Sequence, residues 1–288
     1  MKQGYYIGID VGGTKVLGCL IQFRGDTFAI VHQDLFFVHG LSKKEFITSL
    51  HNLTKELVSF APKNRVQGIG VGLPGQTDQK RKKFLNAPNL SYLKDIVWDV
   101  VLGKRFRTPV KIGNDAHCFT LAEALFGKGK KYNAVFGMTL GTGVGGGLVV
   151  GKEIFYGAQG TAAEVGHMVI DGGKTLEMLG SSKFLKEQTA KSPKEMENAA
   201  RRGDKKARAL YRALGLSVGI GAANIVNAVN PDIIVFGGNI SNAFDLIQAE
   251  IKKQIKKYAV SPLAKKTPCV QSMLGGEAGA IGAAALFL

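Results

Sequence analysis

Two glycine turns contain most of the groups that could bind a phosphate chain. In DVGGTK, Asp10 ends an apolar stretch, Gly12 and Gly13 leave backbone amides uncovered, and Thr14 and Lys15 add a hydroxyl group and a cation. Together these groups suit a phosphate with its Mg²⁺ ion. The Walker A spacing GxxxxGK[ST] is absent, so the turn is not a P-loop, and an ordinary tight hairpin turn is the alternative interpretation.

A second turn, TLGTGVGGG, repeats this chemistry in the middle of the chain. Its open amides and hydroxyl groups belong to Thr139, Gly141, Thr142 and Gly143. Two such turns facing each other across a cleft could hold a polyphosphate chain from both sides. A third turn, FGGN, follows another apolar run, and its Gly237 and Gly238 would let an adenine or a ribose come close to the backbone.

The sequence GND places Asp115 after a further apolar stretch and directly before a helical pattern. A carboxylate between two phosphate turns is well placed to accept a proton from a hydroxyl group that attacks a γ-phosphate. The alternative is that Asp115 only caps the helix, a common use of aspartate. The two turns favour the general base, and the carboxylate could do both.

Four polar side chains lie within EVGHMVIDGGKTLEM at 164–178, namely Glu164, His167, Asp171 and Glu177. They could hold a metal ion, move a proton or bind the hydroxyl groups of a substrate. Asp171 and His167 alone cannot complete a structural zinc site, which needs four protein ligands.

The surrounding pattern predicts an α/β fold that would position these groups. YYIGIDVGGTKVLGCLIQ and AVFGMTLGTGVGGGLVVG each read as a β-hairpin around a glycine turn, and two similar hairpins indicate two similar domains. The segment 43–60 is helical, and the chain beyond residue 176 is mostly helical. We expect domains 1–116 and 117–275, with a small-residue helix at 276–288 that packs back on the first domain.

Composition excludes several classes of protein. A length of 288 residues allows one large or two ordinary domains. No leader pattern and no long apolar run stand out, which favours a cytoplasmic protein. The cysteines, Cys19, Cys118 and Cys269, are scattered without a CxxC pair, which argues against disulfides and against a cysteine zinc site.

The formal net charge of +16 allows a nucleic acid, an anionic surface or a polyanionic substrate as a partner. The basic residues are spread over many segments, and KKQIKK at 252–257 interrupts an apolar helical pattern as a solvated face would. We therefore favour a basic surface without a dedicated partner, and expect neither nucleic acid nor membrane binding.

The motifs together resemble the ROK family of bacterial sugar kinases and repressors. IGIDVGGTK and LGTGVGGGLVV resemble its two phosphate motifs, GVGLPG with NAPNL its sugar-facing segment, GNDA its catalytic strand end, and EVGHM its sugar contact. The resemblance implies a two-lobed ribonuclease-H-like (actin-like ATPase) fold with a cleft between the lobes. It implies ATP and Mg²⁺ as cofactors, Asp115 as general base, Asp10 as support for Mg²⁺, and sugar contacts from Gly75, Asn89, Asn114, Glu164, His167 and Glu177.

Two departures from the family bear on the site. Most members carry a CxCGxxGCxE zinc motif after GHM, whereas GHMVIDGG passes straight to KTLEM, so we expect no zinc site. We expect a carboxylate or carbonyl group beneath His167 to orient its ring instead. The second departure is His117, where the family more often has Asn; it could border the active site or lie on the helix surface.

The resemblance predicts an ATP-dependent hexokinase, first of all a glucokinase, which acts as a homodimer. N-acetylglucosamine, N-acetylmannosamine and fructose are alternative substrates, and inorganic polyphosphate is an alternative donor. A non-enzymatic sugar-sensing protein is the remaining alternative. Repressors of the family carry an additional N-terminal helix-turn-helix domain, and because the first phosphate strand begins at about Tyr5, we expect no DNA-binding domain.

Overall fold

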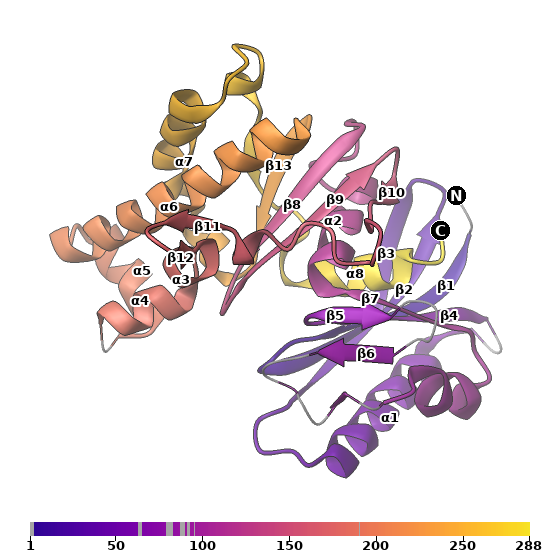
Figure 1. Cartoon of the computed structure of the whole chain (residues 1–288). Coiled ribbons are helices and arrows are strands. Elements are labelled where there is room, and N and C mark those ends of the chain that lie inside the picture. Colours follow the sequence, from indigo (N-terminus) through magenta and orange to yellow (C-terminus); the bar gives the residue numbers. More distant parts are fainter. Residues whose placement is uncertain are drawn as a thin grey trace.

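Two five-stranded sheets with the same internal order form the framework of the protein (Figure 1). The computed structural model describes residues 3–62, 65–78, 83–86, 90, 93–94, 96–189 and 191–288. The first sheet has the order β3-β2-β1-β4-β7, and the second has the order β10-β9-β8-β13-β14. In each sheet an antiparallel hairpin continues into parallel strands, so the predicted repetition and the predicted α/β fold are confirmed.

The strands of the first sheet are β1 (Gly4–Val11), β2 (Lys15–Arg24), β3 (Thr27–Phe37), β4 (Val66–Leu73) and β7 (Val110–Asn114). Those of the second are β8 (Ala134–Leu140), β9 (Val144–Val150), β10 (Glu153–Ile154), β13 (Ile233–Gly237) and β14 (Cys269–Gln271). Two small sheets pair β5 (Gln76–Asp78) with β6 (Lys83–Asn86) and β11 (Val169–Asp171) with β12 (Lys174–Thr175).

The α-helices are α1 (Lys43–Phe60), α2 (Asp115–Phe126), α3 (Leu176–Gly180), α4 (Ser182–Gln188), α5 (Pro193–Arg201), α6 (Lys205–Val229), α7 (Phe244–Tyr258) and α8 (Ala278–Ala285). Short helical turns are η2 (Asp99–Lys104), η3 (Val165–His167), η4 (Asn239–Ala243), η5 (Ala264–Lys266) and η6 (Gly275–Glu277). Local sequence explains α1 well, because Ser42 and Glu45 form a reciprocal capping box at its start.

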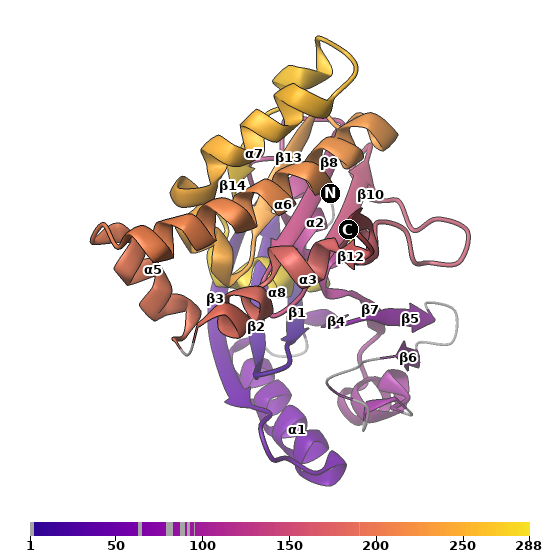
Figure 2. The ribbon, with the colours of Figure 1, turned by 60° about the vertical axis from the view of Figure 1, so that its left-hand side comes forward.

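Helices α2 and α8 lie side by side between the two sheets (Figure 2). Helix α8 packs on β1 and β4 of the first sheet, and α2 packs on β8 and β9 of the second. The two helices cross so closely that a side chain at Gly282 of α8 would overlap the backbone carbonyl of Cys118 in α2. The domain boundary near residue 116 stays a prediction, because α2 contacts strands of both sheets.

Helix α6 is the most apolar long element of the described chain. By length and composition alone it is the one described helix that could cross a membrane, but 61% of its apolar window is buried inside the protein. It packs along α7 and belongs to the core cluster beneath the second sheet. Its hydropathy is therefore that of a core helix.

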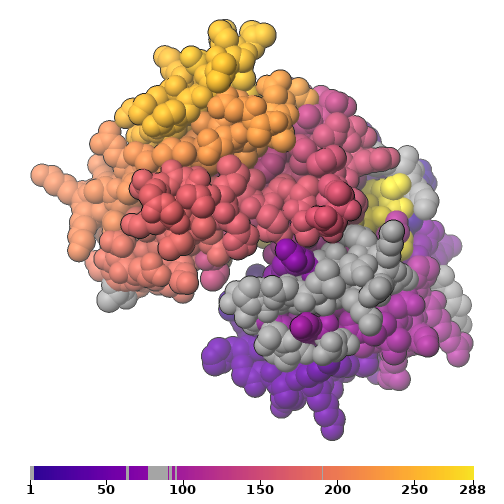
Figure 3. All heavy atoms as spheres, in the orientation of Figure 1, coloured from indigo at the N-terminus to yellow at the C-terminus, as the bar shows by residue number. Residues whose placement is uncertain are grey.

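The surface is hollowed between the part built on the first sheet and the part built on the second (Figure 3). The carboxyl ends of the parallel strands are where α/β proteins bind ligands. Asp10 lies near the end of β1, Asn114 ends β7 and Gly237 ends β13, so the predicted site residues follow such strand ends.

Candidate active site

The turn between β1 and β2 is closed by a hydrogen bond from the Gly12 amide to the Lys15 carbonyl at 2.9 Å. Gly13, Thr14 and Lys15 are exposed, as a phosphate-binding turn requires. Asp10 lies just before this turn and is partly buried. Burial raises the pKa of the Asp10 carboxyl to about 6, against the opposing effect of the Lys15 cation.

Asp115 is the first residue of α2, and its Oδ1 atom accepts a hydrogen bond from the Ala116 amide at 2.8 Å. Burial is the main cause that raises the pKa of its carboxyl to about 7, and the negative charges of Asp10 and Glu164 raise it further. Three carboxylates from β1, α2 and the segment before η3 therefore lie within electrostatic reach of one another. A carboxyl group with a pKa near neutrality is suited to proton transfer.

The capping alternative for Asp115 is wrong, because Asn114 is the N-cap of α2. Its side-chain oxygen accepts a hydrogen bond from the His117 amide at 3.1 Å. Its Nδ2 atom donates to the Gly75 carbonyl, also at 3.1 Å, and so fixes the turn after β4. Gly75 and Asn114 thus hold the backbone around Asp115, and their sugar contacts stay predictions. Asn89, the other predicted contact in this region, lies outside the described residues.

The turn between β8 and β9 is also ordered by its own backbone. The Gly141 amide donates to the Gly143 carbonyl at 2.9 Å, and the Ser182 amide donates to the Gly141 carbonyl at 2.8 Å. Thr142 is exposed at the tip, and Thr139 lies beneath Gly145. This geometry leaves Thr142 accessible to a ligand, whereas the Gly141 amide is already bonded within the turn.

Glu177 contacts this second turn directly. Its Oε2 atom accepts a hydrogen bond from the Val144 amide at 2.9 Å and lies against the Cα atom of Gly143, where a side chain would overlap it. Glu177 therefore joins α3 to the second glycine turn. This contact was not foreseen from the sequence, which predicts a sugar contact at Glu177.

The third turn adjoins the second. Gly237 pairs with Thr139 across the parallel strands β13 and β8. Gly238 adopts a φ of 81° and packs against the carbonyl of Leu140, so no side chain fits there. The two predicted nucleotide turns are thus neighbours at one edge of the second sheet.

A β-hairpin with a two-residue turn occupies the position at which most ROK family members carry the cysteine motif. Strands β11 and β12 are joined by Gly172 and Gly173, whose φ values of 47° and 84° fit a type I′ turn. The hairpin leads into Thr175, which caps α3 and thereby directs Glu177 toward the second glycine turn. Asp171 is exposed at the far end of the hairpin opposite Lys174 and does not join the site.

His167 and Glu164 are both exposed on the segment before this hairpin. The ring of His167 makes no hydrogen bond with the described residues, so the carboxylate or carbonyl group expected to orient it is not found among them. No group of three or more His, Cys, Asp or Glu side chains in the described part of the chain could hold a metal ion.

His117 is a buried residue whose place in the structure was left open by the sequence. The helix-surface alternative is wrong, because the side chain is 2% exposed. Its Nε2 atom lies 3.0 Å from the Ala162 carbonyl, and its ring packs edge-on against Tyr156. Burial lowers the pKa of the imidazole, and the carbonyl acceptor fixes the proton on Nε2. His117 therefore clamps the segment that precedes Glu164 onto α2.

Comparisons with known proteins agree with this arrangement. The sequence profile of the ROK family matches residues 6–288. The glucokinase of Thermotoga maritima is 27% identical over 309 aligned residues, which cover 97% of this chain and 96% of that protein. The xylose repressor of Bacillus spizizenii is 27% identical over 302 residues, which cover 100% of this chain and 78% of the repressor.

A solved structure extends the similarity to the fold. The ROK family glucokinase from Streptomyces griseus, in complex with glucose and AMPPNP, superposes with a TM-score of 0.84 at 27% identity. The superposition covers 98% of this chain and 99% of that one. Because the match runs through both sheets and all three turns, the chain belongs to the ROK family and has the actin-like ATPase fold of its sugar kinases.

Proposed function

We propose that the protein is an ATP-dependent hexokinase of the glucokinase type, with Asp115 as its general base. The observation that carries the proposal is the Asp115 carboxyl, whose pKa is raised to about 7 by burial and by Asp10, which lies just before the first glycine turn. The next residue, Ala116, lies against Gly145, just after the second glycine turn. The glucokinase names of related chains and the glucose and AMPPNP bound to the Streptomyces griseus enzyme support the same reaction.

In this reaction the Asp115 carboxylate accepts the proton of a sugar hydroxyl group as its oxygen attacks the γ-phosphorus of ATP and ADP leaves. The amides and hydroxyl groups of the two turns hold the phosphate oxygens. Gly75, Asn114, Glu164, His167 and Glu177 are proposed to bind the sugar. Closure of the two lobes would exclude water that otherwise hydrolyses ATP.

Asp10 fits a role in binding Mg²⁺, because this ion prefers carboxylate and phosphate oxygens and Asp10 adjoins the first phosphate turn. Bound together with ATP, the ion would neutralise phosphate charge. The proposal also includes a cytoplasmic homodimer, as the family resemblance implies.

The first test offers the protein Mg²⁺-ATP with a pool of hexoses and N-acetylhexosamines and detects phosphorylated sugars by mass spectrometry. Glucose 6-phosphate as the main product would establish the proposal, whereas a phosphorylated N-acetylhexosamine or fructose would keep the kinase and change its substrate. Inorganic polyphosphate replaces ATP in a parallel reaction. If no sugar is phosphorylated in either reaction but glucose still binds, the proposed kinase activity is wrong. The result would then favour the alternative of a non-enzymatic sugar-sensing protein.

The two neighbouring carboxylates predict the pH dependence. Only ionised Asp115 can accept a proton, so kcat/KM should rise with pH through about 7 and then level off. The negative charge of Asp10 contributes to the raised pKa of Asp115. In Asp10→Asn this charge is absent, so we expect the rise of kcat/KM to occur at lower pH. The maximal rate should also fall, because Asp10 is proposed to support Mg²⁺. An unchanged midpoint would contradict this electrostatic coupling.

His117 predicts a separate effect on sugar binding. His117→Phe keeps a ring against Tyr156 but cannot donate to the Ala162 carbonyl, so the segment before Glu164 should loosen. We expect the KM for the sugar to rise about 10- to 100-fold, with a much smaller change in the KM for ATP. His117→Gln retains an N–H donor and should restore much of the loss. Equal increases of both KM values would indicate a general structural defect.

A further inference from the structure

The most prominent feature outside the site is the end of α7 with the segment that follows it, residues 256–266, which we name the α7 tip. It projects at the edge of the molecule (Figures 1 and 2). Two hydrogen bonds of 3.0 Å anchor its base to α6, because the Asn227 side chain bonds to the Tyr258 carbonyl and to the Val260 amide. The base of the tip is thus held by the core helix, and Ala259 and Ala264 of the tip are buried in the core cluster.

The α7 tip exposes apolar side chains at its apex. Val260 is 84% exposed and Leu263 is 81% exposed, more than any other large hydrophobic residue of the described chain, and Tyr258 beside them is 44% exposed. Isolated exposed apolar residues are common on protein surfaces. Two almost fully exposed residues on one projecting turn require a different explanation.

Lysines surround this apex, and of these only Lys253 forms an ion pair with an acid of the described chain, Glu250. Between 251 and 276 the sequence contains Lys252, Lys253, Lys256, Lys257, Lys265 and Lys266, and neither Asp nor Glu. Four of these lysines line a groove of about 470 Å³ between α7 and the segment 265–270. An anionic group would therefore meet only positive charge there.

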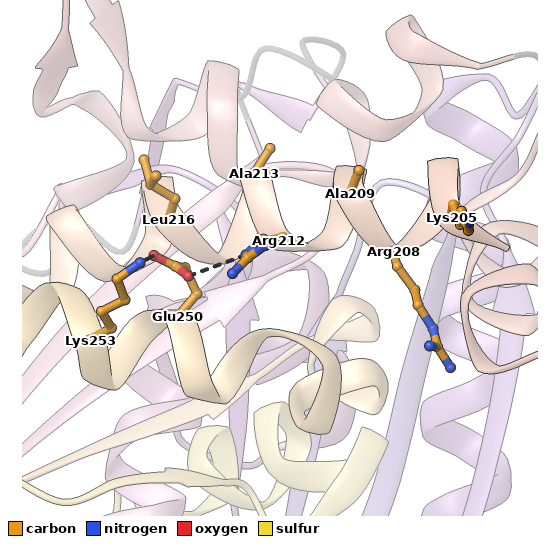
Figure 4. A pocket seen from close by; sticks show the side chains of 8 residues that line it. All are labelled: Lys205, Arg208, Ala209, Arg212, Ala213, Leu216, Glu250 and Lys253. Carbon is orange, nitrogen blue, oxygen red and sulfur yellow. Dashed lines mark ion pairs between the residues drawn. The ribbon is translucent and has the colours of Figure 1, made fainter. Parts of the chain in front are cut away.

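The neighbouring groove between α6 and α7 differs from the α7 tip in its charge balance (Figure 4). It is also lined by cations, but Glu250 pairs with Arg212 at 3.7 Å and with Lys253 at 3.6 Å. Its charge is partly neutralised within the protein, and Leu216 is the one large apolar side chain on its lining. The α7 tip, in contrast, combines lysines that have no acidic partner among the residues that the structure describes with exposed apolar side chains.

We propose that the α7 tip docks on the surface of an anionic lipid bilayer. Lysines are attracted to anionic headgroups, and Val260 and Leu263 would enter the boundary between headgroups and acyl chains. A second copy of the chain fits poorly, because a symmetric contact would bring the same lysines face to face. A nucleic acid would bind the lysines but would leave Val260 and Leu263 in water.

The experiment measures co-sedimentation of the full chain with vesicles of phosphatidylcholine alone or mixed with phosphatidylglycerol. We expect binding to the mixed vesicles only, weakened by salt. Affinity for the mixed vesicles should fall at least about 100-fold when four lysines are replaced by alanine, namely Lys256, Lys257, Lys265 and Lys266. Each lysine near an anionic surface contributes about a fivefold factor to the binding constant. Val260→Ser with Leu263→Ser should reduce it about tenfold or more, because two apolar side chains no longer enter the bilayer.

The matched control replaces four exposed cations of the first lobe, Lys44, Lys55, Lys104 and Arg105, by alanine. This variant has the same net charge as the lysine variant and should bind nearly as well as the unchanged protein. Sugar phosphorylation should be the same in all variants, which separates this proposal from the proposed function. Equal losses in the control variant, or no vesicle binding, would overturn the proposal. So would RNA binding tighter than vesicle binding and insensitive to the serine substitutions.

Discussion

Asp115→Asn should lower kcat by about 100- to 10,000-fold, the usual contribution of a positioned general base. The amide has the same shape as the carboxylate and can still accept the hydrogen bond from the Ala116 amide, so the start of α2 should stay in place. Glucose binding should therefore persist, and calorimetric titration can measure it independently of turnover. Residual turnover within tenfold of the unchanged enzyme would contradict the role of Asp115.

The same substitution should stabilise the protein without ligands. The pKa of Asp115 is raised from 3.8 to about 7 in the folded state, so folding favours its protonated form. That contribution to stability is complete below pH about 4 and is lost as pH rises through about 7. The melting temperature of Asp115→Asn should therefore exceed that of the unchanged protein at pH 8 and approach it at pH 4. Asp171→Asn, an exposed change outside the site, should alter neither activity nor stability.

Gly282→Ala should destabilise the protein by at least about 2 kcal/mol, within the range for overpacked cores. In most helices the same change stabilises by about 1 kcal/mol, because alanine has the higher helix propensity. Here the new methyl group would overlap the Cys118 carbonyl, a backbone atom that cannot rotate away. Urea denaturation should give the free energy of unfolding, and activity should fall because α8 also carries Gly279, which lies against the Asp10 carboxylate.

Gly276→Ala is the matched control for this prediction. Gly276 lies in η6, just before α8, and a methyl group there would meet no atom within 4 Å. We expect its free energy of unfolding to stay within about 0.5 kcal/mol of the unchanged protein, as for most surface changes. A stabilised Gly282→Ala variant would mean that α2 and α8 can separate without cost.

The sequence predicts those parts of the fold that local patterns determine. The limits expected for α1 agree with the structure, because its apolar period and its capping box are both encoded within neighbouring residues. The two glycine hairpins also agree with the structure, since alternating apolar residues around a glycine turn define register as well as type. The hairpin of β11 and β12 was missed because it is short and mostly polar.

The candidate site was predicted less completely, because several of its contacts join distant parts of the chain. The bond between Glu177 and the Val144 amide depends on how α3 meets the second turn, and no local pattern encodes it. Asn114 and Asp115 are adjacent polar residues before one helix, so the sequence could not tell which of them is the cap. Histidine at 117, a departure from the usual asparagine, was the available signal for the clamp on Ala162.

The position of α8 also has a consequence for biosynthesis. Strands β1 and β4 are completed by residue 73, but the helix that covers them ends at residue 285. At the usual rates of translation the ribosome needs about 10 to 40 s to make the intervening chain. During that interval one apolar face of the first sheet has no native cover, so nascent chains should depend on chaperones most strongly before the last helix emerges.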